Sequence, residues 1–500
     1  MTNPVELPAT YRPYQWAPPL AELAERHGLR PEQIIRFDQN VPPLPGVPQV
    51  PVGESFARLN EYGDGTYREL KEAAAGYAGV EPDRIVVGAG ADDLILLIAR
   101  VFLGPGRVAS AQELTYPLYR IATGLAGAEL GAGDADLVWV CNPENPTGEL
   151  RPPDSLPELG PLVVVDEAYW EFAGETVVPL RAENVIALRT MSKAFGLASL
   201  RVGYAVCPPP IAAELEARRA PAPISEPAAR IAAAALRDPR LDVEQIVAER
   251  ERMRAALAAA GFEVTDSRGS FLYVLSDRGE ELEAQGLVPR RFPTGFRVTV
   301  RLPAENDRVL AALGAAAAEP SPSRSAALVR TTTETALRIS LDLDGQGRAR
   351  IATGIGLLDH LLSALAFHGG LDLELLAGGD LQVDEHHMTE DVLAALGDAL
   401  AQALGTRAGI TRYGSADVPM DEALARCTID LVQRPHAEVR VPGLYGHAFE
   451  RFAMQARLTL HLEADGRDAH HMAEAAFKAL GRALRVAIAP GASGSTKGAM

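Results

Sequence analysis

Two patterns of apolar residues divide the chain. In the first half, short continuous apolar runs alternate with longer stretches of helical periodicity. Continuous runs are typical of parallel strands that are buried on both faces, and their alternation with helices predicts a doubly wound α/β sheet. In such a sheet, ligands bind outside the carboxyl ends of the strands. The predicted strands are residues 84–88, 136–141, 162–166 and 185–189, with a helix between Asp93 and Val101.

In the second half, apolar and polar residues alternate, as in strands that are exposed on one face. Residues 326–344 are predicted to form one strand with a turn at its end, and residues 349–353 the returning strand of a hairpin. A helix is expected over residues 354–370, and further strands at 426–431 and 437–441. His447 is expected near the start of a helix and His461 at the end of a strand.

One segment of the second half occurs twice. A histidine doublet, His386 and His387, is followed by Glu390, and the same arrangement returns 84 residues later. The offset also relates Gly397 to Gly481, so we infer an internal duplication. Each copy is predicted to be a helix that follows a strand. The second copy begins with His470, His471 and Glu474.

Imidazole and carboxylate groups together suit a metal ion such as Mn, Fe, Co, Ni or Zn. His387 and Glu390 are three residues apart, so we expect them on one helix face, with His386 pointing elsewhere. Adjacent helical residues diverge by about 100°, and each doublet is therefore expected to serve two ions, with ions shared between subunits as one arrangement. Divided evenly, each ion receives three imidazoles and one carboxylate from His360, His386, His387, Glu390, His447, His470, His471 and Glu474.

Composition limits the classes of protein. The 500 residues are 47% hydrophobic, which predicts two or three globular domains. We expect domains at residues 1–319 and 328–500, joined by a Pro- and Ser-rich linker at 320–327. The net charge of −18 argues against a nucleic-acid partner. We expect a cytoplasmic protein, because the sequence has no signal peptide or membrane-length apolar run and its three cysteines form no Cys-x-x-Cys pair.

Chemically reactive residues follow the predicted strands of the first half. Lys193 lies in TMSKAFG, and Thr190, Ser192 and Arg201 could bind a phosphate. A lysine beside a phosphate site can form a Schiff base with pyridoxal phosphate, whose ring nitrogen needs a carboxylate such as Asp166. Taken singly, Lys193 is compatible with a surface lysine and Asp166 with a helix cap. Their joint order at strand ends favours the cofactor site.

The segments NPENPTG, VVVDEAYWEF and LRTMSKAFGLASLRVGY resemble fold-type I aminotransferases, and the last one most resembles histidinol-phosphate aminotransferase. The resemblance covers about residues 10–315 and implies a doubly wound sheet plus a small domain. It implies a dimer in which Tyr62 reaches the partner's site, Arg297 as the carboxylate ligand, and either Arg290 or Arg291 on the substrate phosphate. Glu144, where the family has Asn, is expected to face solvent. The implied cofactor residues are Tyr62, Ala91, Asp92, Tyr116, Asn145, Asp166, Tyr169, Thr190, Ser192, Lys193 and Arg201, with Lys193 catalytic.

The second half resembles imidazoleglycerol-phosphate dehydratase over about residues 328–500, through TGIGLLDHLL, DEHHMTED, GITRYGSADVPMDEAL, DAHHMAEAAFKALGRALR and SGSTKGAM. The resemblance implies a duplicated two-layer α+β fold, a site with two Mn²⁺ ions held by the eight residues above, and a large assembly. Glu334 is implied as a catalytic residue. The implied substrate contacts are Glu334, Arg412, Arg434, Lys478, Ser495 and Lys497.

The two resemblances imply consecutive reactions in histidine biosynthesis. Dehydration of imidazole glycerol phosphate gives imidazoleacetol phosphate, and transamination of this ketone with glutamate gives histidinol phosphate and 2-oxoglutarate. Two alternatives stay open: the first half could act on another phosphorylated amine, or it could be an inactive scaffold. A transcription regulator is disfavoured because no basic helix-turn-helix segment is present.

Overall fold

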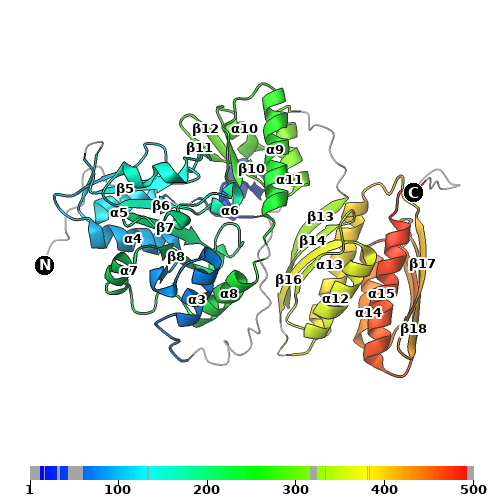
Figure 1. Ribbon diagram of the computed structural model, residues 1–500. Coiled ribbons are helices and arrows are strands. Elements are labelled where there is room, and N and C mark those ends of the chain that lie inside the picture. The colour runs from blue at the N-terminus through cyan, green and yellow to red at the C-terminus, as the bar shows by residue number, and fades with distance from the viewer. Residues whose placement is uncertain are drawn as a thin grey trace. The chain divides into compact units, whose positions relative to one another are not determined.

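The computed structural model describes residues 12–15, 17–30, 34–42, 60–131, 134–239, 241–315, 324–332, 334–379, 381 and 383–491. It separates into two compact units, Met1–Glu319 and Pro320–Met500 (Figure 1). Among the described residues, no helix combines the length and apolar character that a membrane span requires.

The first unit is built on a seven-stranded sheet of order β2-β8-β7-β6-β5-β3-β4, in which only β8 runs antiparallel to its neighbours. The prediction of a doubly wound sheet is thereby confirmed. Its strands are β2 (Ile85–Gly88), β3 (Val108–Ser110), β4 (Glu129–Leu130), β5 (Leu137–Cys141), β6 (Val163–Asp166), β7 (Val185–Thr190) and β8 (Gly203–Val206).

Each face of this sheet has its own hydrophobic core, because successive side chains of a strand point to opposite faces. On β6, Val164 belongs to one core and Val163 and Val165 to the other. Helices on the two sides bury these faces. They are α3 (Arg68–Ala78), α4 (Ala91–Phe102), α5 (Leu118–Leu125), α6 (Trp170–Ala173), α7 (Pro209–Glu216) and α8 (Glu226–Arg237).

A smaller sheet follows in the first unit, of order β11-β12-β9, with long helices beside it. Its elements are α9 (Val243–Ala259), β9 (Phe271–Val274), α10 (Gly279–Ala284), β11 (Arg290–Phe292), β12 (Gly295–Thr299) and α11 (Pro303–Ala312). The N-terminal segment joins this part, because β1 (Ile35–Arg36), which follows α1 (Leu20–His27), pairs with β10 (Leu287–Val288). The pairing brings Asp38 and Asn40 next to β12.

The second unit consists of two copies of one β-β-β-α-β-α motif, as the repeated segment predicted. Each copy forms a four-stranded sheet, with orders β13-β14-β16-β15 and β17-β18-β20-β19. The first copy is β13 (Ser325–Thr331), β14 (Thr335–Asp342), β15 (Ala349–Ala352), α12 (Gly356–Gly369), β16 (Asp372–Gly379) and α13 (His386–Leu404). The second is β17 (Tyr413–Met420), β18 (Ala423–Asp430), β19 (His436–Arg440), α14 (Leu444–Gln455), β20 (Thr459–Asp465) and α15 (Ala469–Ala487).

The four helices lie between the two sheets and share one hydrophobic core (Figure 1). They pair across the copies: α12 packs on α15, and α13 packs on α14. Each pair meets at a glycine of the repeat. A Cβ atom on Gly481 would lie 2.5 Å from the carbonyl oxygen of Leu365, and one on Gly397 would lie 2.5 Å from that of Phe452.

Three local predictions were wrong. Residues 326–344 form two strands rather than one, because β13 ends at Thr331 and the antiparallel β14 begins at Thr335. β15 does not return along β14 as a hairpin; it pairs in parallel with β16, which lies between them. His461 lies inside β20 rather than at its end.

The predicted linker, residues 320–327, overlaps the first strand of the second unit. β13 begins at Ser325, so residues 325–327 are strand rather than linker. Ser325, Ala326 and Ala327 pair there with the end of the antiparallel strand β14, and Ser325 lies opposite Asp342. The remaining linker residues, 320–323, are outside the described part of the chain.

We expect Gly481→Ala and Gly397→Ala to lower the free energy of unfolding of the second unit, each by about 1–3 kcal/mol, because the added methyl group must push two helix backbones apart. Far-ultraviolet circular dichroism during urea denaturation measures this. Gly356→Ala, at an exposed helix start with no atom within 4 Å of the new methyl group, is the control. Equal midpoints for all three variants would contradict the packing described.

Candidate active sites

The first candidate site lies at the carboxyl ends of β6 and β7. Asp166, the last residue of β6, is 4% exposed. Its carboxylate accepts hydrogen bonds from the Tyr119 hydroxyl at 2.7 Å and from the Ala168 amide at 3.1 Å. Burial nevertheless raises the pKa of Asp166 to about 6. A cationic group opposite it would hold this carboxylate in its charged form, as a protonated pyridine nitrogen does.

Lys193 follows β7 and is half-buried. Its amine donates a hydrogen bond to the Gln39 carbonyl at 3.3 Å and lies 5.6 Å from the centre of the Tyr169 ring. Burial, and next the positive charge of Arg297, lower the pKa of Lys193 to about 8. A lysine with a lowered pKa has a larger neutral fraction, and the neutral amine is the nucleophile.

A cradle for an anion lies beside Lys193. α4 begins at Ala91, directly after Gly90, so its free backbone N–H groups and the positive end of its dipole are available there. The Thr190 and Ser192 hydroxyls are 3.0 Å apart, and Arg201 forms a 3.0 Å ion pair with Asp92. Glycine is needed at position 90 because its φ is +85° and a Cβ would lie 2.7 Å from Arg201. This donor set fits a phosphate group.

The predicted ring contacts surround the same space. The Tyr116 hydroxyl donates to Asp92 at 3.0 Å, and Tyr169 accepts a hydrogen bond from Asn40 at 3.0 Å. Asn145 accepts a hydrogen bond from the buried Arg297 guanidinium, which also donates to the Asp38 carbonyl at 2.6 Å. The structure therefore brings Asn145, Asp166, Tyr169, Lys193 and Arg297 together. Tyr62 is apart from them and is 99% exposed.

The expectation that Glu144 faces solvent was wrong. Glu144 is 3% exposed. Its Oε1 atom accepts hydrogen bonds from the Thr115 hydroxyl at 2.5 Å and from the Asn145 amide at 3.0 Å. Burial raises its pKa to about 7. The carboxyl group thus joins the loop before Tyr116 to the loop that carries Asn145, which an exposed turn residue could not do.

The two arginines of β11 have different surroundings. Arg290 is opposite Arg297 in the antiparallel pair, so both side chains lie on one face of the small sheet. Arg290 also lines a cavity of about 610 Å³, together with Tyr14 and Arg120. Arg291 points to the other face and forms ion pairs with Glu280 at 3.3 Å and Glu283 at 3.2 Å.

The second candidate site is a pair of clusters, each made of two histidines and a glutamate. In the first, the Nε2 atoms of His386 and His447 lie 3.5 and 3.4 Å from Glu390 Oε2. In the second, His360 and His470 each lie 3.6 Å from an oxygen of Glu474. The two imidazole rings of each cluster stack, with centroids 6.0 and 6.5 Å apart. We call these clusters the α13–α14 trio and the α12–α15 trio.

The two trios have the chemistry of a metal site. In the α13–α14 trio, one ligand atom from each residue lies within 4.8 Å of the others. A cation neutralises each glutamate: Arg451 lies 2.8 Å from Glu390, and Lys478 lies 2.7 Å from Glu474. Two imidazoles and one carboxylate suit a divalent first-row transition metal and leave further coordination positions open.

The sequence assigned the wrong member of each doublet to the glutamate. His386, one full turn before Glu390, faces it, and His387 does not. His387 Nδ1 instead lies 3.8 Å from Glu334 Oε2, and His471 Nδ1 lies 2.9 Å from Glu422 Oε2. The two histidines of a doublet therefore face different carboxylates, and their rings are inclined by 79°. The four-ligand set expected for each ion is therefore not complete within the described residues.

The residues expected to hold the substrate phosphate of the dehydratase differ in exposure and in how far they are already paired. Arg412 is 7% exposed, and its Nε and Nη2 atoms donate to Asp430 at 2.7 and 2.9 Å, so only Nη1 remains for a ligand. Arg434 is exposed. Lys478 is half-buried beside the α12–α15 trio. Ser495 and Lys497 lie outside the described residues.

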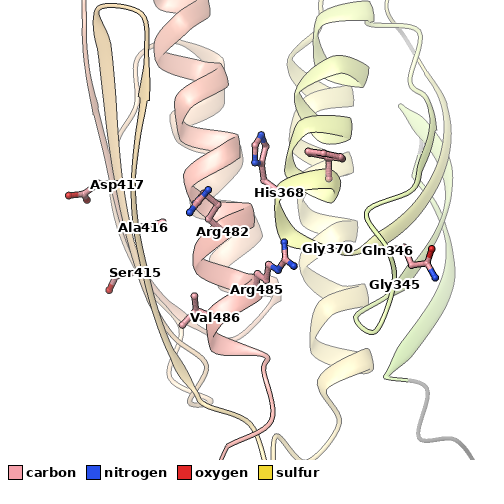
Figure 2. A pocket seen from close by; sticks show the side chains of 11 residues that line it. Gly345, Gln346, His368, Gly370, Ser415, Ala416, Asp417, Arg482, Arg485 and Val486 are labelled. Atoms are coloured by element: carbon pink, nitrogen blue, oxygen red, sulfur yellow. The ribbon is translucent and has the colours of Figure 1, made fainter.

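A cavity of about 520 Å³ lies at the other end of α12 and α15. His368, Arg482 and Arg485 line it, and Figure 2 shows His368 and Arg485 in the space between these helices. His368 is two helical turns after His360, or about 12 Å along the axis. The residues that line the cavity do not include the members of the α12–α15 trio.

Sequence reasoning missed three residues of these sites. Tyr119 is three residues after Tyr116, and this helical spacing could have indicated that both face the strand ends. Glu422 follows the first copy's Glu334 by 88 residues rather than the 84 that separate the histidine doublets, so only the matching starts of β14 and β18 identify it. Asn40 had no signal, because only the pairing of β1 with β10 brings it to Tyr169.

Two families match the chain. "Aminotransferase class I and II" matches residues 33–131 and 128–313, and "Imidazoleglycerol-phosphate dehydratase" matches residues 353–484. The chain is 35% identical to histidinol-phosphate aminotransferase 1 of Archaeoglobus fulgidus over 56% of this chain and 98% of that protein. It is 46% identical to imidazoleglycerol-phosphate dehydratase of Cutibacterium acnes over 30% of this chain and 84% of that protein.

A solved structure agrees with the first match. The histidinol-phosphate aminotransferase of Sinorhizobium meliloti, in complex with pyridoxal 5′-phosphate, superposes with a TM-score of 0.54 at 26% identity. The match covers 61% of this chain and 96% of that one. The predicted fold type of the first half is confirmed by this likeness.

We expect Glu144 to make the first unit less stable as the pH rises. Its pKa is about 7 in the fold against 4.5 for an ordinary glutamate, so folding favours the protonated form. The stability is fully present below pH 4.5 and decreases up to and through about pH 7, by roughly 3 kcal/mol. Glu144→Gln, which cannot ionise, should therefore gain stability relative to the wild type between pH 5 and pH 8.

Urea denaturation followed by tryptophan fluorescence measures this effect, because all three tryptophans precede residue 171. Glu149→Gln is the matched control, since Glu149 is exposed in the same loop. If the difference in unfolding free energy between Glu144→Gln and the wild type is the same at pH 5 and pH 8, the prediction is contradicted and Glu144 is charged in the fold.

Proposed function

Because the chain belongs to the class I and II aminotransferases over its first half and to the imidazoleglycerol-phosphate dehydratases over its second, we propose that it catalyses two consecutive reactions of histidine biosynthesis. The second half removes water from imidazole glycerol phosphate, and the first half transaminates the resulting imidazoleacetol phosphate with glutamate. The observation that carries the dehydratase proposal is the pair of His–His–Glu trios at equivalent positions of the two copies.

The dehydratase residues have separate tasks. The α13–α14 and α12–α15 trios hold divalent ions, for which we propose Mn²⁺, two per site. Bound ions would make the imidazole ring of the substrate an electron sink. Glu334, which is exposed beside His387, takes the carbon-bound proton next to the leaving hydroxyl. Lys478 and Arg434 carry the positive charge that retains the phosphate.

The aminotransferase residues act on one cofactor and one substrate. Pyridoxal phosphate, when bound, supplies an electron sink for the loss of a proton from the amino-acid carbon. Asp166 pairs with its ring nitrogen, and the α4 N-terminus with Thr190, Ser192 and Arg201 holds its phosphate. Lys193, whose pKa is about 8, moves the proton at the substrate carbon. Arg297 binds the substrate carboxylate.

We assign the substrate phosphate of the aminotransferase to Arg290. The Arg290 side chain shares a face with Arg297 and lines a cavity, whereas both acidic neighbours of Arg291 neutralise that guanidinium. A free guanidinium binds a phosphate in a two-pronged geometry, and one that is already paired must first lose its partner.

We further propose that the chain works as a homo-oligomer in the cytoplasm. The 99% exposure of Tyr62 supports a dimer in which this side chain reaches the partner's cofactor. The missing fourth ligand of each trio supports a larger dehydratase assembly, in which doublet histidines complete sites of neighbouring subunits.

We expect the two activities to be separable by single substitutions. Lys193→Ala should lower transamination at least about 100-fold and leave dehydration intact, because it removes the proton-transferring amine of one site only. It should also change the visible absorbance of the bound cofactor. His470→Ala should abolish dehydration alone, since a buried carboxylate then lacks an imidazole neighbour.

Assays of both reactions on each purified variant, with the exposed Arg26→Ala and His436→Ala as controls, measure this separation. Loss of both activities in either variant would contradict two independent sites. A wild-type chain that dehydrates the substrate but transaminates no histidinol phosphate would leave the first half as a scaffold.

We expect Arg290→Gln to raise the KM for histidinol phosphate about 10- to 100-fold, the effect of losing one charge-assisted hydrogen-bond pair. Arg291→Gln should change it less than about twofold, because that side chain already has two acidic partners. Steady-state kinetics with 2-oxoglutarate measures both values. The reverse order of effects would assign the phosphate to Arg291.

A further inference from the structure

The duplication places a carboxylate at the same point of both copies. Glu334 directly precedes the first residue of β14, and Glu422 directly precedes the first residue of β18. Each faces the second histidine of a doublet, which is the imidazole that turns away from its own trio: Glu334 faces His387, and Glu422 faces His471. The two carboxylates therefore occupy equivalent positions of the two copies.

Their contacts now differ. Glu422 Oε2 lies 2.9 Å from His471 Nδ1, and its Oε1 accepts a second hydrogen bond from the Asp468 amide at 2.9 Å. Glu334 Oε2 is 3.8 Å from His387 Nδ1, which is too far for a hydrogen bond. The Glu422 side chain is 22% exposed and that of Glu334 is 49% exposed. One carboxylate is held at both oxygens, and the other faces solvent.

The connections beside each carboxylate cause this difference. β17 and β18 are joined by residues 421–422 alone, with Asp421 at a φ of +49°, a conformation that Asp tolerates well. Three residues, 332–334, separate β13 from β14. Residues 466–468 connect β20 to α15, whereas residues 380–385 connect β16 to α13. The shorter turn and the shorter loop together bring Glu422 to the first residues of α15.

A hydrogen bond to Nδ1 decides what the other ring nitrogen does. A carboxylate beside Nδ1 keeps the proton there, so Nε2 presents its lone pair outward. Ligand histidines of metal sites are oriented in this way. Asp468 and Asp421 are further acidic neighbours of His471. Asp421 Oδ2 is 3.6 Å from Nε2, and its side chain is 68% exposed. At that distance it does not occupy the lone pair.

We propose that Glu422 is a positioning residue, which holds His471 with Nε2 directed at a metal ion, and that Glu334 has lost this task and transfers the proton. The inference rests on the proposed metal-dependent dehydration. It divides the labour of two residues that the repeat made equivalent: Glu422 acts through His471, and Glu334 acts on substrate.

Titration of the chelator-treated full chain with Mn²⁺, followed by the electron paramagnetic resonance of the free ion, tests the division. The wild type should bind two ions per chain. Glu422→Ala should bind one of them about 10- to 100-fold more weakly, the usual effect of removing a residue that orients a ligand. Glu334→Ala should bind both as the wild type does. Glu463→Ala, which removes an exposed carboxylate paired with Arg426 at 3.1 Å, is the matched control.

Dehydration assays at rising Mn²⁺ separate the two roles further. Excess Mn²⁺ should restore the turnover of Glu422→Ala, because its site is weakened but chemically complete. It should not restore Glu334→Ala, whose turnover should stay at least about 100-fold below the wild type. Glu422→Gln, which keeps the volume and an acceptor for the Asp468 amide, carries the same comparison if the alanine variant does not fold by circular dichroism.

The outcomes are distinct. Unchanged affinity for both ions in the Glu422 variants, or turnover that excess Mn²⁺ does not restore, would overturn the positioning role. Weaker Mn²⁺ binding in Glu334→Ala would overturn the division between the two carboxylates. A folded wild-type chain that neither binds Mn²⁺ nor dehydrates the substrate would instead overturn the proposed function.

Discussion

The close approach of α12 to α15 and of α13 to α14 is the constraint on which both histidine–glutamate trios depend. Each trio takes one imidazole from one helix of a pair, and an imidazole and a carboxylate from the other. The distance between packed helices is set by the side chains at their contact. Gly397 and Gly481 reduce that contact to backbone against backbone. This close approach lets the ligands converge. A metal site needs such precision, since its ligands must be held to within about 0.5 Å.

Burial organises the first half in a comparable way. Asp166 and Glu144 end up in an apolar environment because the parallel strands on either side are covered on both faces. The same burial that raises their pKa values lowers that of Lys193. In a medium of low dielectric constant, each charge depends strongly on the partner opposite it. The strand ends of the sheet therefore define a site in which a charged, planar ligand would supply the opposite charges that the buried carboxylates and Lys193 need.

The sequence was most informative where the pattern is long and periodic. It predicted the parallel strands, the duplication and the two folds, because continuous apolar runs and a repeated offset survive local variation. It could not partition the histidines, since the choice between His386 and His387 depends on how the helix begins. Asp384 accepts a hydrogen bond from the His386 amide, and Asp468 does the same for His470, which fixes the first turn of each helix. The burial of Glu144 was equally invisible, because a turn motif does not state which of its residues point inward.

The comparison of the two copies shows where a duplicated fold is free to diverge. The helices α13 and α15 share one core, so their registers and their glycines cannot change without moving both trios. The connections that flank Glu334 and Glu422 differ in length. Loops tolerate insertions far better than packed elements do. Equivalent residues on such connections can therefore acquire different contacts while the metal ligands keep equivalent positions in the two copies. Glu334 and Glu422 can then take different roles without a change in the packed core.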